Sequence, residues 1–177
     1  MKRFLLVLGV VSLVAALSVA PVLAKGPNGP SGKADVGHLY LFEKDPTTWD
    51  VVDGGAWGKL NYKCGEDGFS FVFNGHGLEP GDAYELMNYV DPWPGTGSQL
   101  LASGVVNDDG DIHLAGSVDC LKAYDWSEEE DVDIEKVVGA KIWLVLADDF
   151  DEAGGVMAGW NPTDYLFEAA LTTCCVC

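Results

Sequence analysis

The sequence predicts an all-β protein, an antiparallel β-sandwich of about eight strands with at most one short helix. Short apolar runs recur between clusters of Gly, Asp, Asn and Pro, which favour turns. Phe69, Phe71 and Phe73 occupy alternate positions, the spacing that places side chains on one face of a strand. Strands do not alternate with long amphipathic helices in this pattern, so a parallel βαβ arrangement is disfavoured.

Residues 1–24 have the features of a cleaved export signal. The basic pair Lys2 and Arg3 precedes a long apolar run that ends in small residues. We therefore expect a mature chain that begins near Lys25 with a flexible Gly/Pro-rich linker over 25–35, in a protein that is secreted or held at the cell surface. Because the apolar run approaches the length of the shortest membrane spans, retention as an anchor is the alternative.

The chain is strongly acidic, with 28 Asp and Glu against 10 Lys and Arg and a formal charge of −18. Such a surface repels nucleic acid and anionic lipid, so neither is expected as a partner. No membrane insertion is expected once the signal is cleaved. Two interpretations of the charge remain open, namely solubility in saline surroundings and attraction of divalent cations.

The domain is placed at residues 36–171, and its first three strands follow from local pattern. Residues 36–43 carry apolar side chains on both faces and predict a covered strand. Residues 57–63 predict a weaker strand, and the Gly and acidic residues of 65–68 predict a hairpin turn. The strand with three alternate Phe rings follows. Its aromatic row is either core or a sugar platform, and core is the interpretation adopted here.

The most specific local signal is the segment from Leu78 to Tyr84, which has the pattern Leu-x-Pro-Gly-x-x-Tyr. It resembles the tyrosine corner of fibronectin type III and other immunoglobulin-like sandwiches. The resemblance implies an immunoglobulin-like fold in which the Tyr84 hydroxyl bonds back to the backbone above a buried Leu78. Pro80 and Gly81 would form the corner. The alternative is an ordinary Pro-Gly turn before a strand.

The later strands follow from composition. Residues 101–106 and 112–118 are apolar runs on either side of an Asn-Asp-Asp-Gly turn, and we expect them to pair as an antiparallel hairpin. Residues 140–147 form the most hydrophobic stretch of the mature chain and predict a central strand with Trp143 as a core ring. Residues 165–171 predict the last strand. A capping-box pattern indicates either a short helix or a loop over 128–137.

Four blocks of the chain, at residues 75–81, 91–95, 139–146 and 159–168, resemble segments of uncharacterised secreted β-sandwich proteins of archaea and bacteria. The similarity covers residues 36–171. It implies export and a single domain, and it implies no particular activity.

The cysteines are disulfide candidates, because an exported chain meets oxidising conditions. They are Cys64, Cys120, Cys174, Cys175 and Cys177. Cys64 and Cys120 end expected strands and make the simplest pair. The tail over 172–177 could reach back to one of them, link two chains by disulfides or bind a soft metal. A metal site normally needs four ligands from separated turns, which disfavours the metal.

Sequence motifs of catalysis are missing from the chain: it has no nucleophile elbow, no His-Glu-x-x-His and no phosphate loop. We therefore expect no enzyme, although a carboxylate pair for glycoside hydrolysis stays an alternative in so acidic a chain. His38, His76 and His113 fall on or beside different strands and are expected to be hydrogen-bonded or surface residues. Asp148, Asp149 and Asp151 form a candidate calcium site, with solvated turns as the alternative. No other cofactor is expected.

Trp93, set between Pro92 and Pro94, and the nearby Tyr89 are the candidate ligand-binding residues. They form either an exposed contact for a glycan or an extracellular protein, or a rigid loop whose Trp folds onto the core. The sequence thus predicts a secreted, non-catalytic β-sandwich protein with an extracellular binding or structural role. The alternatives are a carbohydrate-binding module that also uses Trp49, a secreted hydrolase, and a subunit of a disulfide-linked surface layer or filament.

Overall fold

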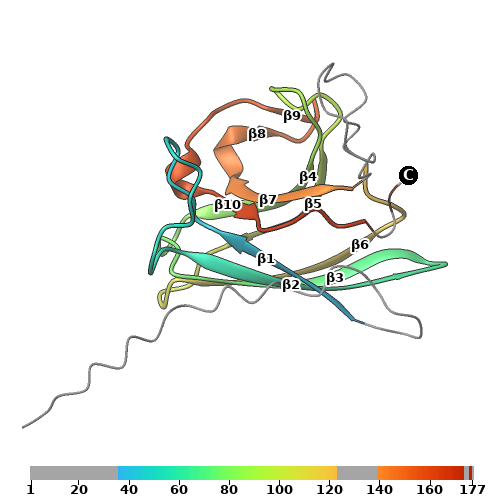
Figure 1. Ribbon diagram of the computed structural model, residues 1–177, viewed down its shortest axis with the longest axis horizontal. Coiled ribbons are helices and arrows are strands. Elements are labelled where there is room, and N and C mark those ends of the chain that lie inside the picture. Colours follow the sequence, from blue (N-terminus) through green and yellow to red (C-terminus); the bar gives the residue numbers. More distant parts are fainter. Residues whose placement is uncertain (1–35, 123–138, 174–175, 177) are drawn as a thin grey trace, which may run out of the picture.

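The computed structural model describes residues 36–122, 139–173 and 176, and these are mostly antiparallel β-structure. One eight-stranded sheet dominates, in the order β5-β4-β7-β10-β1-β2-β3-β6 (Figure 1). Its strands are β1 (Gly37–Phe42), β2 (Trp57–Gly65), β3 (Gly68–His76), β4 (Ala83–Tyr89), β5 (Gln99–Val105), β6 (Asp111–Val118), β7 (Lys141–Leu146) and β10 (Leu166–Glu168). A two-stranded ribbon pairs β8 (Phe150–Asp151) with β9 (Val156–Met157).

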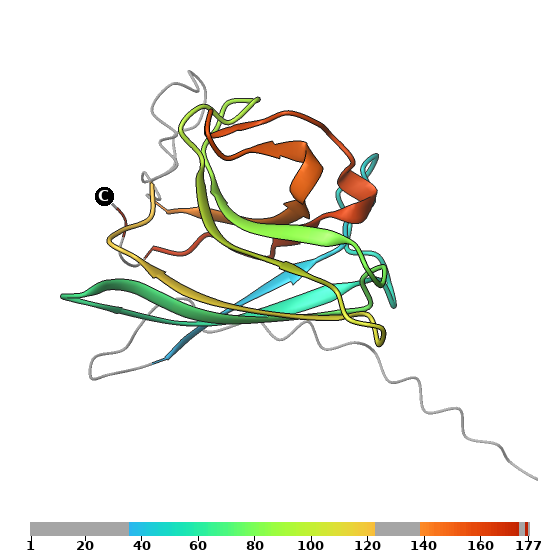
Figure 2. The ribbon, with the colours of Figure 1, turned by 180° about the vertical axis from the view of Figure 1, so that it is seen from behind.

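The large sheet curls until its edge strands β5 and β6 approach each other, so that it is nearly closed (Figures 1 and 2). At Gly116 in β6, an added Cβ would lie 3.1 Å from the main-chain oxygen of Leu101 in β5. A single curled sheet differs from two separate facing sheets, and an immunoglobulin-like sandwich is therefore not confirmed.

Most strands lie where the sequence predicts them. The turn at 65–68 joins β2 to β3 in register, with Cys64 opposite Phe69. The three alternate rings of β3 are all buried, which confirms their interpretation as core. The hydrophobic stretch 140–147 forms β7 between β4 and β10, and the predicted last strand is present in shorter form as β10.

The predicted hairpin of residues 101–106 with 112–118 is wrong. The turn forms, since the Asn107 amide donates to the Asp111 carbonyl at 2.9 Å. However, β5 is hydrogen-bonded to β4 and β6 to β3, which places these two strands at opposite edges of the sheet. Small residues permit the edge strands to cross in close contact: a Cβ at Gly104 would lie 2.7 Å from the Leu114 side chain. The turn residues predict a reversal, but they do not decide which strands pair.

The segment around Tyr84 is only partly as expected. Tyr84 and Leu78 are both buried, and burial raises the pKa of Tyr84 to about 12. The Gly81 amide donates to the Val106 carbonyl at 3.0 Å, so the Pro80–Gly81 turn packs against the start of the next turn. No hydrogen bond joins the Tyr84 hydroxyl to the described backbone upstream, so the tyrosine corner is not confirmed.

Two apolar clusters flank the sheet wall formed by β4, β7 and β10. The inner cluster fills the curled sheet, with Leu41, Leu60 and Phe73 among its fully buried members. The outer cluster lies on the opposite face and consists of Met87, Tyr89, Trp143, Val145, Phe150, Met157, Tyr165 and Phe167. Residues 147–165, which include β8 and β9, contribute to this outer cluster (Figure 1). Strand β7 is therefore buried on both faces, which explains its nearly continuous hydrophobicity.

Several sequence predictions lie outside the described residues: the signal at 1–24, the linker at 25–35, the segment 128–137 and the tail residues Cys174, Cys175 and Cys177. Within the described part, the only helical turns are short, and none has the length and apolar character needed to cross a membrane.

Candidate functional site

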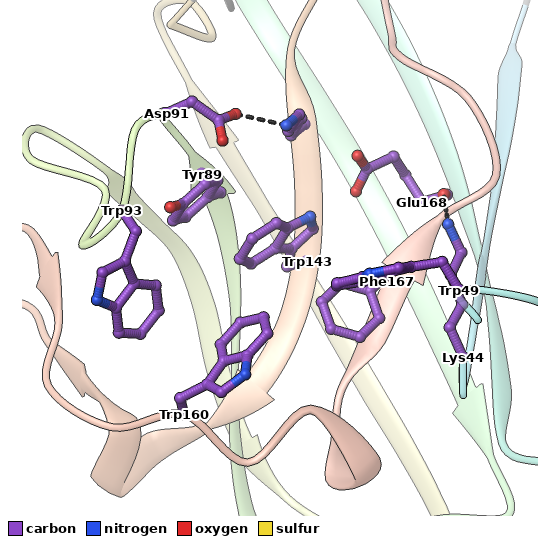
Figure 3. A pocket seen from close by; sticks show the side chains of 10 residues that line it. Lys44, Trp49, Tyr89, Asp91, Trp93, Trp143, Trp160, Phe167 and Glu168 are labelled. Carbon is purple, nitrogen blue, oxygen red and sulfur yellow. Dashed lines mark hydrogen bonds and ion pairs between the residues drawn. The ribbon is translucent and has the colours of Figure 1, made fainter. Parts of the chain in front are cut away.

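A pocket of about 670 Å³ opens beside the outer cluster, and its volume falls within the range typical of small-molecule sites (Figure 3). Its lining is almost entirely aromatic and charged. The aromatic residues are Trp49, Tyr89, Trp93, Trp143, Trp160 and Phe167, and the charged ones are Lys44, Asp91, Lys141 and Glu168. These side chains come from β4, β7 and β10 and from three loops, so residues far apart in the chain form one site.

The floor of the pocket is a packed aromatic layer. Tyr89 and Trp143 stack with their ring centroids 3.8 Å apart and their planes 10° apart. Phe167 meets Trp143 edge-on at 5.2 Å and 79°. All three side chains are buried, since each exposes at most 8% of its surface. Such a layer is rigid and presents an apolar base to a ligand.

The rim consists of three tryptophans that remain exposed in the free protein, Trp49 at 49%, Trp93 at 50% and Trp160 at 42%. Trp160 lies between the others: its ring is 5.2 Å from that of Trp93 and 6.4 Å from that of Trp49. Large exposed aromatic side chains gathered around a concavity are characteristic of recognition sites, because burying them against a ligand releases water.

Trp49 is held in an unfavourable backbone conformation, with a φ of +61°. A bulky residue rarely adopts this left-handed conformation. The turn before it is fixed by Asp45, whose side chain accepts bonds from the Thr47 and Thr48 amides at 2.7 and 3.1 Å. These bonds lower the pKa of the Asp45 carboxyl. The main-chain oxygen of Asp45 also accepts the Trp49 amide at 2.8 Å, and the result is a Trp ring directed at Phe167, 5.2 Å away.

Trp93 stands on a loop that is tied at several points. Ser98 donates from its hydroxyl to the Gly95 carbonyl at 2.6 Å and accepts the Val90 amide at 3.0 Å. Gly95 has a φ of +81°, and a Cβ there would lie 2.4 Å from the Tyr89 ring, so glycine is required at this position. The Met157 amide donates to the Pro94 carbonyl at 2.8 Å, which joins this loop to β9.

Trp160 is positioned by a buried carboxylate. Asp149, at the end of the 3-10 turn η2 (Ala147–Asp149), is 7% exposed. Its Oδ2 accepts bonds from the Tyr165 hydroxyl at 2.6 Å and the Asn161 side-chain amide at 2.8 Å. Its main-chain oxygen accepts the amides of Ala158 and Gly159. Asp149 thus holds the loop through residues that precede Trp160 in the chain and through residues that follow it.

The charged lining residues make one ion pair and one hydrogen bond from a lysine to the main chain. Lys141 Nζ lies 2.5 Å from Asp91 Oδ2. Lys44 Nζ donates to the main-chain oxygen of Glu168 at 3.1 Å. Burial raises the pKa of Glu168 from 4.5 to about 7, opposed by hydrogen bonding to its own main chain, by Lys141 and Lys44, and by the Trp143 side chain. The Glu168 atom Oε2 is buried and makes no hydrogen bond within the described structure.

The structure places both sequence candidates for ligand binding, Tyr89 and Trp93, on this pocket, together with Trp49. Trp93 does not fold onto the core, whereas Tyr89 contributes to the floor. Sequence reasoning missed Trp160 and treated Trp143 as a core ring without a role at a site. Trp160 follows a Gly and precedes Asn-Pro, a loop setting like that of Trp93, and this similarity is the signal that could have identified it.

The candidate calcium residues do not converge. Asp149 is buried and bonded to Tyr165 and Asn161, whereas Asp148 and Asp151 are exposed. The Asp151 side chain accepts the Gly154 amide at 3.1 Å within its own turn. Residues 36–122, 139–173 and 176 contain no group of three or more His, Cys, Asp or Glu side chains arranged to hold a metal ion.

Each histidine is hydrogen-bonded on the sheet surface, as expected. The ring Nδ1 atoms of His38, His76 and His113 lie 2.7 to 2.8 Å from side-chain oxygens of Asn61, Asp111 and Asn74, respectively. The cysteine pairing stays a prediction. Val176 forms a parallel bridge with Leu121, the residue that follows Cys120.

Comparisons of this chain with protein-family models, with curated proteins and with solved structures found no match. The pocket is therefore the feature that indicates a function.

Proposed function

We propose that this is a secreted, non-catalytic binding protein whose aromatic pocket takes a small neutral carbohydrate. The observation that carries the proposal is the ring of three exposed tryptophans around a buried aromatic floor. Sugars present patches of C–H groups that stack on aromatic faces, and their hydroxyls need hydrogen-bond partners at the edges of those faces. The pocket offers both.

The charges of the pocket support a neutral ligand. Two lysines and two acids line it, and Lys141 is neutralised by Asp91. An aromatic cage for a cation gains from an excess of acidic groups, which this lining lacks. Lysines donate and carboxyl oxygens accept hydrogen bonds, so the same four residues can bind sugar hydroxyl groups that act as either acceptors or donors.

The proposal is tested by replacing the rim residues. Trp93→Ala and Trp160→Ala should each weaken binding of mono- and disaccharides, identified first on a glycan array, by at least about tenfold, the scale of an aromatic binding hot spot. Val105→Ala is the control, because Val105 is 63% exposed on β5 and lies outside the pocket. Unchanged sugar binding in both rim variants, measured by calorimetry, would contradict the proposal.

Export is part of the same proposal and is supported by the signal-like residues 1–24. It predicts that the chain expressed with its own leader is recovered outside the cell. Intact mass should then show a chain that begins near Lys25. Recovery of the full-length chain in the membrane fraction would favour the anchor.

A second candidate, a secreted glycoside hydrolase, is favoured by one observation. The pocket holds two carboxyl groups, Asp91 and Glu168, and the raised pKa of Glu168, about 7, suits a general acid. Against it, Asp91 is paired with Lys141. Release of new reducing ends from an oligosaccharide that binds, lost in Glu168→Gln, would establish the hydrolase. Stable binding without product formation would support the non-catalytic binding protein and reject the hydrolase.

A further inference from the structure

The aromatic pocket continues onto the open surface of the sheet. Directly opposed residues of an antiparallel pair project from the same face. The register places Trp143 opposite Phe167, Phe167 opposite Phe42, Phe42 opposite Trp57, and Trp57 opposite His76. One row of rings therefore crosses β7, β10, β1, β2 and β3, and its first two members line the pocket.

Outside the pocket the neighbouring rings are stacked or tilted. We use the name aromatic strip for Tyr40, Phe42, Trp57 and His76. The planes of Tyr40 and Phe42 differ by 12°, those of Tyr40 and Trp57 by 32°, and those of Trp57 and His76 by 39°. Within the pocket, by contrast, three pairs of rings meet edge-on, at 74° to 79°, beside the stacked Tyr89 and Trp143. The pocket encloses a group, whereas the strip offers a platform.

Polar side chains border the strip. Lys59 Nζ lies 5.7 Å from the centre of the Tyr40 ring. Asn74, opposite Lys59 in the sheet, is bonded to His113, and His76 is bonded to Asp111. These groups can donate to and accept from hydroxyls at the edges of a stacked sugar ring.

The exposed area is too small for a stable protein dimer. Tyr40 and Trp57 are 39% and 40% exposed, and the other two rings are partly buried. Aromatic side chains of this size would contribute roughly 300 Å² in total, well below the approximately 800 Å² per partner of a stable interface. A narrow ligand suits the strip better than a second copy of the chain.

We propose that the ligand is a linear oligosaccharide, whose end occupies the pocket and whose following units lie along the aromatic strip. Strands are spaced by about 4.8 Å, so the strip extends roughly 10 Å from Phe42 on β1 to His76 on β3, which is more than one sugar ring covers. Chains of β-1,4-linked pyranoses fit this description, because their rings present flat apolar faces in succession. The inference rests on the proposed function, since the pocket must bind a sugar first.

The test is a length series. The chain from Lys25 to Cys177 is titrated by calorimetry with β-1,4-linked oligomers of glucose, mannose and N-acetylglucosamine, each from two to six units. Wild-type affinity should rise at least about tenfold between two and six units. Tyr40→Ala and Trp57→Ala should abolish this rise while binding the two-unit sugar as the wild type does. Val105→Ala, exposed on β5 away from the strip, is the control for surface truncation. Circular dichroism confirms that each variant is folded.

The outcomes separate the two proposals. If no mono- or disaccharide binds, or if Trp93→Ala and Trp160→Ala both leave its binding unchanged, the proposed function fails and this inference fails with it. If two-unit sugars bind through Trp160 but affinity does not grow with length, or grows equally in Trp57→Ala, only the strip is refuted. A wild-type dimer that Trp57→Ala converts to a monomer, without dependence on sugar length, would assign the strip to a second copy of the chain and overturn the inference.

Discussion

The hydroxyl of Tyr165 donates a 2.6 Å hydrogen bond to Asp149, and the same Tyr165 oxygen accepts the Asn161 main-chain amide at 3.0 Å. Burial and the bond to Asp149 both raise the pKa of Tyr165, so its hydroxyl remains a donor. The two residues thus brace the loop between them, which carries Trp160 over the pocket. A buried carboxylate that serves as a loop anchor explains why an Asp stands in an otherwise apolar region.

Tyr165→Phe removes this donor without removing the ring. We expect a loss of about 1–3 kcal/mol in the free energy of unfolding, because the buried Asp149 carboxylate loses one of its two donors and the Asn161 main-chain amide loses its acceptor. Sugar affinity should fall as well, since Trp160 is no longer fixed. Urea denaturation and calorimetry measure the two effects. Asp148→Asn, at the exposed neighbouring position, is the control and should change neither stability nor sugar affinity. If Tyr165→Phe also changes neither, Asp149 does not anchor the loop that carries Trp160.

Trp49 provides a test of backbone strain at the rim. Both Trp49→Gly and Trp49→Ala lose the ring contacts with Phe167 and Trp160, and both should bind sugar more weakly. Their stabilities should differ in an unusual direction. With φ at +61°, Gly avoids the steric cost that Ala retains, so the Gly variant should be the more stable by about 1 kcal/mol. Thermal or urea unfolding compares the pair directly. A more stable Ala variant would show that the left-handed conformation relaxes when Trp is removed.

The sequence predicts the strands of this protein better than their partners. Alternating Phe69, Phe71 and Phe73 and the apolar stretch at 140–147 reflect local burial, and both are where they were expected. Strands β5 and β6 do not pair with each other, and instead they cross in close contact at Gly104 and Gly116. This arrangement is a property of the folded sheet and leaves no local pattern in the sequence.

The same contrast applies to the pocket. Trp93 could be singled out because two prolines flank it, but nothing near Trp160 in the sequence indicates that Asp149 anchors its loop. The continuous row from Trp143 to His76 depends on the register of five strands and cannot be read from any one of them. Recognition surfaces assembled across strands are thus the least predictable part of such a chain.

Asn88 on β4 is a fully buried polar residue whose loss should destabilise the fold. Its Oδ1 accepts the Lys122 amide at 2.6 Å, and its Nδ2 donates to the carbonyls of Lys122 and Lys141 at 3.3 and 3.1 Å. Asn88→Ala removes the side-chain partner of these partly buried main-chain groups, and we expect a loss of about 1–3 kcal/mol in urea unfolding. Asn74→Ala, on the sheet surface, should cost less. Equal effects of the two substitutions would argue against the buried network.

Glu168 should make stability depend on pH in a direction opposite to that of a salt-bridged acid. Its pKa is about 7 in the folded protein, against an ordinary value of 4.5. Between these values the unfolded chain has released the proton while the folded protein still holds it. Stability therefore falls as pH rises from about 4.5 to 7, and the contribution of this residue is constant above that range. The full change is on the order of 3 kcal/mol, at about 1.4 kcal/mol per pKa unit.

Glu168→Gln isolates this contribution, because the amide keeps the shape of the protonated acid and cannot ionise. The difference in unfolding free energy between the variant and the wild type should be small near pH 4.5 and should grow in favour of the variant up to about pH 7. The pKa of Glu85 is also raised by burial, so it contributes a slope of the same sign to both proteins, which cancels in the difference. A difference that is flat with pH would mean that Glu168 is already ionised in the folded pocket, and its carboxylate would then be available to accept two hydrogen bonds from a bound sugar.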